Sequence, residues 1–224
     1  MSVILMDLLE LIYPEKCTFC HQRLHGKTRY ICEDCVRNLP YTNLDASQAF
    51  YDVSRCYSLL YYENEVKESL HRYKFYGLEL YAPIYAGMMN ASFRIDLMGI
   101  DLISWVPLHR TRKRSRGYDQ AELIARELSR LSGFPCERLL KKTVNIAPQS
   151  SIKGGIKERK ENISNVYAPV NRLQIEGKRI LIVDDIVTTG ATLGECASVL
   201  KKNGAAEIQA ITVARGRNLK NADI

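Results

Sequence analysis

The sequence predicts an α/β protein with a doubly wound parallel sheet, preceded by a small cysteine-rich module. From residue 54 onward, expected strands alternate with expected helices, which is typical of a parallel sheet covered on both faces. Ahead of this pattern, four cysteines occur as two C-x-x-C pairs. We therefore expect an N-terminal module at residues 1–45 and an α/β domain at residues 46–224.

Composition narrows the class of protein. The 224 residues are 46% hydrophobic and carry a net charge of +7, which suits one medium domain plus a module and an anionic partner. No apolar run approaches the roughly 20 residues that a membrane span needs. The N-terminal stretch has acids among its apolar residues and lacks the basic start of a secretory signal. We expect a cytoplasmic protein whose first residues form a short helix docked on the chain itself.

The cysteine pairs predict a closed structural zinc site. Two knuckles, separated by eleven residues, can present four thiolates to one tetrahedral ion, as in a zinc ribbon; they are Cys17, Cys20, Cys32 and Cys35. Disulfide bonds and redox knuckles are the alternatives, and disulfides need an oxidising compartment. His21 or His25 is a further alternative as a replacement for one thiolate.

The elements of the α/β domain follow from apolar periodicity. In order, we expect a strand at 54–62, helices at 64–76 and 82–93, a strand at 101–106, a helix capped by Asp119, a helix at 193–203 and a strand at 207–213. Tyrosines are dense between residues 57 and 85. Their spacing follows helical and strand faces, which favours core and rim packing over a stacking surface for bases.

The stretch from Arg179 to Thr192 is the most informative part of the chain. An apolar run, Ile180 to Val183, predicts a buried strand, and two acids follow it at once, Asp184 and Asp185. A small hydroxyl-rich turn then leads into a helix; its residues are Thr188, Thr189, Gly190, Ala191 and Thr192. The amide groups at a helix N-terminus bind phosphate, and Gly190 permits close approach. Carboxylates one turn away can bind ribose hydroxyls or Mg²⁺, so the stretch predicts a ribose-5-phosphate site. An ordinary βα unit capped by threonines is the alternative.

A basic segment follows the strand at 101–106. Five of its seven residues are cationic, namely Arg110, Arg112, Lys113, Arg114 and Arg116. Because like charges repel on a helix, we expect a strand-to-helix loop that binds phosphate. The five cations exceed what one pyrophosphate needs, which suggests a longer polyanion, with Tyr118 stacking on a base. A solvated loop is the alternative.

These motifs resemble the ComF family of competence proteins, within the type I phosphoribosyltransferases. The stretch from Val183 to Thr192 resembles their signature for phosphoribosyl pyrophosphate (PRPP), and the segment ending Arg116-Gly-Tyr-Asp-Gln120 resembles a ComF pattern. A charged stretch at 143–165 resembles the ComF block that falls at the flexible loop of the fold. There, Arg159, Lys153 or Lys157 is expected to close over pyrophosphate. ComF proteins also carry a four-cysteine module at the N-terminus.

The resemblance implies one of two functions. The first is a competence protein that binds single-stranded DNA during DNA uptake, together with a ComFA-type helicase and a DprA-type recombination mediator. The second is a phosphoribosyltransferase that uses PRPP and Mg²⁺, with Asp184 and Asp185 as catalytic residues beside an oxocarbenium-like centre. We identify no segment that would bind the acceptor of such a reaction.

Overall fold

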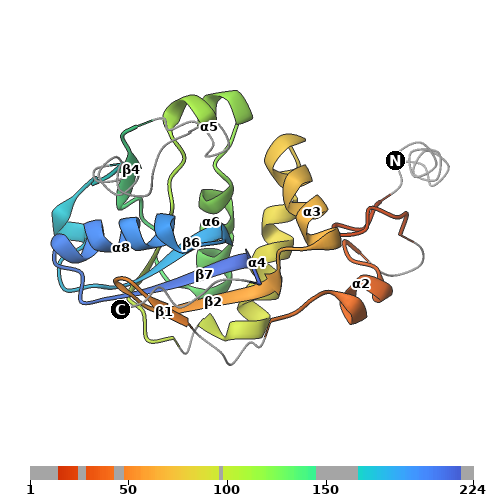
Figure 1. Cartoon of the computed structure of the whole chain (residues 1–224), viewed down its shortest axis with the longest axis horizontal. Helices are drawn as coiled ribbons and strands as arrows, with labels where there is room; N and C mark the ends of the chain where they lie inside the picture. The colour runs from red at the N-terminus through yellow and green to blue at the C-terminus, as the bar shows by residue number, and fades with distance from the viewer. Residues whose placement is uncertain (1–14, 25–28, 43–47, 96–97, 145–165, 218–224) are drawn as a thin grey trace.

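The centre of the molecule is a five-stranded sheet in the order β1-β2-β7-β6-β3 (Figure 1). The structure, a computed structural model, describes residues 15–24, 29–42, 48–95, 98–144 and 166–217. The strands span Gln48–Phe50 (β1), Val53–Tyr61 (β2), Leu102–Trp105 (β3), Arg179–Val187 (β6) and Glu207–Arg215 (β7). Neighbours β2, β7, β6 and β3 run parallel, whereas β1 pairs antiparallel with β2. The predicted parallel α/β sheet is confirmed.

Helices cover both faces of this sheet. They span Glu33–Asn38 (α2), Asn64–Phe75 (α3), Tyr81–Phe93 (α4), Arg110–Arg116 (α5), Gln120–Ser132 (α6) and Ala191–Lys202 (α8). One apolar core lies between the sheet and α3, α4 and α6, and a second lies between the sheet and α8. The second core also takes in a two-stranded sheet, formed by β4 (Leu140–Lys142) and β5 (Tyr167–Pro169). A short 3₁₀ helix, η3 (Arg172–Gln174), precedes β6. The sheet is therefore doubly wound, as predicted.

Strand β6 shows how sequence alternation serves two cores. Leu181 and Val183 belong to the core under α3, α4 and α6, whereas Ile180 and Ile182 belong to the core under α8. Successive side chains of a strand point to opposite faces, which requires apolar residues at every position. The strand does not end at Val183 as the sequence suggested, because its pairing with β7 continues to Val187. Both acids are therefore part of the strand.

The first described residues pack onto the α/β domain. Phe19 is buried in the same core as Tyr85 of α4, with ring centroids 6.1 Å apart at an edge-on angle. Ser69 of α3 donates to the carbonyl oxygen of Thr18 over 2.6 Å. The division at residue 45 stays a prediction, but residues on its two sides share one core.

The tyrosines of α3 and α4 are mainly core residues. Tyr73, Tyr81 and Tyr85 are buried, and the rings of Tyr73 and Tyr85 meet edge-on at 5.5 Å. Core packing, which their spacing favoured, is confirmed for these three. Tyr76, just beyond α3, is different, because 66% of it is exposed.

Within the described part of the chain, none of the helices has the length and apolar composition that crossing a bilayer requires.

Phe19 offers a test of this packing. We expect Phe19→Ala to lower the free energy of unfolding by about 3–5 kcal/mol, because it deletes a buried ring and leaves a cavity against Tyr85. Val36→Ala, on the exposed side of α2, is the matched control and should change stability by less than about 0.5 kcal/mol. Urea denaturation with zinc in the buffer measures both. Equal midpoints for the two variants would contradict the shared core.

Candidate functional site

Asp184 and Asp185 lie in the last part of β6 and point to opposite faces of the sheet. Asp185 forms an ion pair with Lys74 of α3, with Oδ2 and Nζ 2.8 Å apart. Asp184 lies on the α8 side, where burial, with the charge of Asp184 added, raises the pKa values of Cys196 and Tyr167. The backbone amide of Asp185 donates to Oδ1 of Asp184 over 2.8 Å. Alternation thus separates two adjacent carboxylates that would otherwise repel each other.

The two carboxylates differ in their electrostatics. Burial, with the charge of Asp185 added, raises the pKa of Asp184 well above its usual range. Burial opposes the charge on Lys74, but the attraction of Asp185 outweighs it and raises the pKa of that amine. Asp185 and Lys74 are therefore held as a charged pair, while Asp184 is disposed to take a proton or a cation.

The threonine turn follows β6 directly and leads into α8. Gly190 has φ +76° and is the N-cap residue of this helix. A Cβ atom there would meet the ring of Phe50 at 2.8 Å. Gly190 is therefore needed both for the left-handed backbone and for packing on Phe50. Thr188 and Thr189 are exposed, and Thr192 lines a cavity with Asp184 and Asp185.

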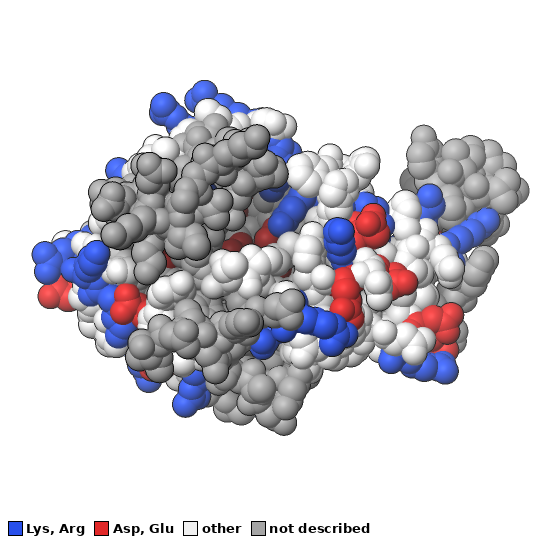
Figure 2. All heavy atoms as spheres, in the orientation of Figure 1, with Lys and Arg blue, Asp and Glu red and all other residues white. Residues whose placement is uncertain are grey.

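That cavity, with a volume of about 190 Å³, lies where β3 and β6 end. Asp184, Asp185 and Thr192 come from the β6–α8 unit, and four cations surround them: Lys74, Arg112, Arg116 and Lys142. Figure 2 shows acidic and basic atoms side by side in a hollow on this face of the molecule. The carboxyl ends of parallel strands are where ligands bind in open α/β sheets. We call this space the β6 cavity.

The basic segment is a helix, not the loop that the sequence suggested. Residues Arg110–Arg116 form α5, capped by His109, whose side chain accepts from the amide of Thr111. The expected repulsion is offset by outside partners: Lys113 pairs with Glu122 over 2.6 Å, and Arg116 donates to Gln120. Like-charge neighbours on a helix cost only about 0.2–0.5 kcal/mol each. The contacts of Lys113 and Arg116 with α6 are therefore sufficient to offset the repulsion among the cations of α5.

Helical spacing divides the cations of α5 between two cavities. Arg112 and Arg116, four residues apart, line the β6 cavity. Arg110, Lys113 and Arg114 line a second cavity of about 360 Å³, whose wall also contains Trp105 and Arg138. We call this second space the outer cavity. The cations therefore line two neighbouring cavities with α5 between them.

Tyr118 lies in the core rather than on the surface. It is 5% exposed, its hydroxyl donates to the carbonyl oxygen of Tyr73, and its ring lies 5.8 Å from that of Tyr73. The expectation that Tyr118 stacks on a base is therefore wrong for this structure. Asp119, by contrast, accepts from the amide of Glu122 at the start of α6, as the predicted cap should.

Several predicted site residues lie outside the described residues. Arg159, Lys153 and Lys157 belong to the segment 145–165, and His25 falls in the segment 25–28. His21 is described, but it is not part of the cysteine cluster.

Sequence reasoning missed two lysines of the β6 cavity. Lys74 lies near the end of α3, and Lys142 lies on β4, where its amine is 5.1 Å from the centroid of the Tyr167 ring. Burial, helped by the charge of Arg112, lowers the pKa of Lys142. Neither lysine is in a motif or near Asp185 in sequence, so no local signal could have found them.

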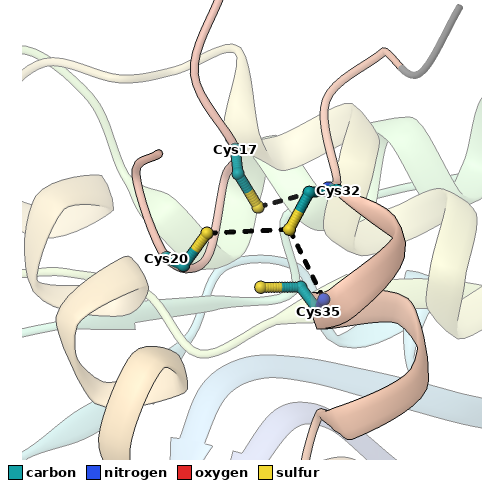
Figure 3. Close-up of side chains that lie close together, drawn as sticks. All are labelled: Cys17, Cys20, Cys32 and Cys35. Atoms are coloured by element: carbon teal, nitrogen blue, oxygen red, sulfur yellow. Dashed lines mark hydrogen bonds between the residues drawn. The ribbon is translucent and has the colours of Figure 1, made fainter. Parts of the chain in front are cut away.

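The four cysteines of the two knuckles converge on one point (Figure 3). Their sulfur atoms all lie within 4.8 Å of one another, and the Sγ atoms of Cys20 and Cys32 are 3.7 Å apart. Zinc–sulfur bonds of about 2.3 Å in a tetrahedron place sulfurs about 3.8 Å apart, so the cluster fits zinc. Backbone amides of Cys32 and Cys35 donate to Sγ of Cys17 and Cys32, respectively, over 3.4 Å. The four cysteines can therefore bind a metal such as zinc.

The comparisons with known proteins agree with this geometry. Residues 108–223, about half of the chain, match the phosphoribosyl transferase domain family, and the chain belongs to that family. The match runs from the start of α5 through β7.

Relatives over the whole chain narrow the class further. Competence protein F of Haemophilus influenzae is 27% identical over 89% of this chain and 96% of that protein. Competence protein ComFC of Bacillus subtilis is 28% identical over 92% of this chain and 88% of that protein. The DNA utilization protein YhgH of Escherichia coli is 27% identical over 89% of this chain and 96% of that protein. The chain is a ComF family protein with a phosphoribosyltransferase fold.

The cysteine cluster predicts one tightly bound zinc ion per chain. Cys32→Ser should lose that ion, because three thiolates leave the tetrahedral site incomplete, and should destabilise the cysteine-rich module. Cys136→Ser is the matched control, since Cys136 lies outside the cluster, and it should keep its zinc. Metal analysis after dialysis against a mild chelator measures both. Absence of zinc from the unaltered protein would refute the assignment.

The raised pKa of Asp184 predicts that removing its charge makes the folded state more stable. Because its pKa is raised in the folded state, folding stability falls as pH rises from the ordinary carboxyl pKa through the raised value. Asp184→Asn should therefore raise the thermal midpoint at pH 7, by about 2–4 °C for each kcal/mol added to the free energy of unfolding. The gain should shrink toward pH 5.

Asp101→Asn is the control of opposite sign. Hydrogen bonds from Arg179 lower the pKa of Asp101 to about 2, so its charge favours the folded state at neutral pH. This variant should not gain stability at pH 7. A lower midpoint for Asp184→Asn at pH 7 would show that the carboxylate is not a cost to folding.

Proposed function

We propose that this ComF family protein binds PRPP or a nucleotide phosphate in the β6 cavity and handles single-stranded DNA along α5. The alternative is a phosphoribosyltransferase that acts on a nucleobase or another acceptor. Relatives that are named for competence and DNA utilization support the first function. The arrangement of charge in the β6 cavity supports a phosphate ligand under either.

The observation that carries the proposal is the excess of cations over carboxylates in the wall of the β6 cavity. The β6 cavity is lined by four cations and by three acids, Asp119, Asp184 and Asp185, which gives 4 − 3 = +1. Burial raises the pKa values of Asp119 and Asp184 and lowers that of Lys142, so proton uptake by either acid increases the positive excess, whereas loss of the Lys142 proton removes it. A cavity of this charge suits a ligand with a phosphate group and hydroxyls together.

The proposed roles follow from position. The turn Thr188 to Thr192 receives the 5′-phosphate, because amide donors at the start of α8 and threonine hydroxyls surround that point. Asp184 and Asp185 bind the ribose hydroxyls, directly or through Mg²⁺. Arg112, Arg116 and Lys142 bind the pyrophosphate from the opposite wall. Arg159 is proposed from the family resemblance to close over it.

The transferase alternative uses the same residues differently. Departure of pyrophosphate leaves positive charge on the ribose ring, and the carboxylates of Asp184 and Asp185 stabilise it. Arg112, Arg116 and Lys142 stabilise the leaving pyrophosphate. Asp184 and Asp185 would hold Mg²⁺, which would neutralise part of the charge on the phosphate oxygens.

The DNA-handling function assigns the outer cavity to the nucleic acid backbone. Arg110 and Arg114 line the outer cavity and not the β6 cavity, so they are spare cations with respect to PRPP. A single strand bound there is held mainly through its phosphates, with little sequence preference. We propose a ComFA-type helicase and a DprA-type mediator as partners in the cytoplasm, on the family resemblance alone.

The two faces of α5 separate these functions experimentally. Replacing Arg110 and Arg114 together by Ala should weaken single-strand binding and flatten its salt dependence by roughly one to one and a half units, at about 0.7 per phosphate. PRPP affinity should stay within about two-fold. Arg112→Ala should instead weaken PRPP binding in Mg²⁺ by on the order of 1.5–3 kcal/mol, as for loss of one charge-assisted contact. Calorimetry and fluorescence anisotropy measure the two ligands.

Arg130→Ala is the matched control, because Arg130 is an exposed arginine at the far end of α6 that pairs with Glu127. Release of pyrophosphate from PRPP with a panel of bases decides the transferase alternative. If the double variant loses only PRPP affinity and binds single strands normally, α5 serves pyrophosphate alone, and the transferase becomes the better conclusion.

A further inference from the structure

Two large aromatic side chains are exposed where α3 ends. Phe75 is 63% exposed and Tyr76 is 66% exposed, although most aromatic residues of α3 and α4 are buried. The ring of His71 lies 4.8 Å from that of Phe75 and 5.8 Å from that of Tyr76. We call His71, Phe75 and Tyr76 the aromatic ledge.

The sequence of α3 sets the ledge on the side away from the core. Val66, Leu70 and Tyr73 face inward at helical spacing and are fully buried. His71 and Phe75, four residues apart, share a different face of the same helix. Nothing in the apolar core requires an aromatic residue at position 75 or 76, so these rings need another explanation.

The ledge is continuous with the β6 cavity through two cations. Lys74, next to Phe75 in sequence, lines the cavity and pairs with Asp185. Arg116 of α5 also lines the cavity and places its guanidinium 5.2 Å from the centroid of the Phe75 ring. A ligand that leaves the cavity between Lys74 and Arg116 therefore meets aromatic rings at once.

We propose that the aromatic ledge stacks on a nucleobase whose own or neighbouring phosphate lies in the β6 cavity. The inference rests on the proposed function, because the cavity must hold the phosphate. Among possible occupants, a nucleotide or single strand combines a flat ring for Phe75 and Tyr76 with an anion for Lys74 and Arg116. An apolar protein segment would satisfy the rings but would offer no anion to Lys74 and Arg116. The ledge thus supplies the base contact that burial of Tyr118 removes, and the acceptor contact that the transferase alternative requires.

Phe75 and Tyr76 are tested by separating the base from the phosphate. The probes are a short oligothymidylate and an abasic strand of the same length, with PRPP as a ligand that has no base. Replacing Phe75 and Tyr76 together by Leu keeps apolar bulk and removes the rings. We expect oligothymidylate affinity to fall roughly 5- to 150-fold, as for the loss of one stacked base, with abasic-strand and PRPP affinities changed less than about two-fold.

Phe75→Trp is the matched aromatic variant and should keep oligothymidylate affinity. The chain has a single tryptophan, Trp105, which is 3% exposed, so a second one at position 75 reports directly on the ledge. Its fluorescence should be quenched by oligothymidylate and not by the abasic strand.

The outcomes distinguish failure of the proposed function from failure of the aromatic ledge as a base-stacking surface. If PRPP and both strands fail to bind the unaltered protein, the proposed function fails first. If all three bind but the double Leu variant treats oligothymidylate as the unaltered protein does, or loses both strands equally, the ledge is not a base-stacking surface. A change in sedimentation of the double variant without a change in strand binding would also overturn it, and would make the ledge a protein contact.

Discussion

The structure depends on how β6 carries two consecutive carboxylates into a buried sheet. An isolated charge in such a place costs several kcal/mol, so each acid needs its own compensation. Strand alternation sends Asp185 toward α3, where Lys74 pairs with it, and Asp184 toward α8, where its pKa rises instead. On one face of the sheet an ion pair compensates the buried acid, and on the other face a raised pKa does. One carboxylate is fixed as an ion, and the other is left to respond to a ligand.

The same constraint explains why α5 is a helix. Were all five cations of α5 gathered at the β6 cavity beside Lys74 and Lys142, their charge would far exceed that of its three acids. Helical rotation sends Arg112 and Arg116 inward and turns Arg110 and Arg114 to the outer cavity. The β6 cavity is then close to charge balance, with a small positive excess that an anion can remove. A flexible loop would not enforce that division.

What the sequence reveals depends on how local the determining feature is. The strand, paired acids, turn and helix from Arg179 to Thr192 are contiguous, so spacing and residue type predict them well. The cysteine knuckles are also two local patterns, and their convergence follows from metal geometry. Lys74 and Lys142 line the cavity because of where the tertiary fold places α3 and β4, which no periodicity encodes. Tyr118 shows the reverse error: its place in a basic motif suggested a surface role, but the packing of α3 on α6 buries it.

The cysteine-rich module takes part in this packing rather than standing apart from it. Arg72 of α3 donates to the carbonyl oxygens of Thr18 and Phe19 over 3.0 and 2.5 Å, and Ser69 donates to Thr18 as well. Arg72 is two residues before Lys74 and three before Phe75. The knuckle is therefore fastened to the helix that supplies both the partner of Asp185 and the exposed rings. A metal bound by the four cysteines would therefore also hold α3, and through α3 one wall of the β6 cavity.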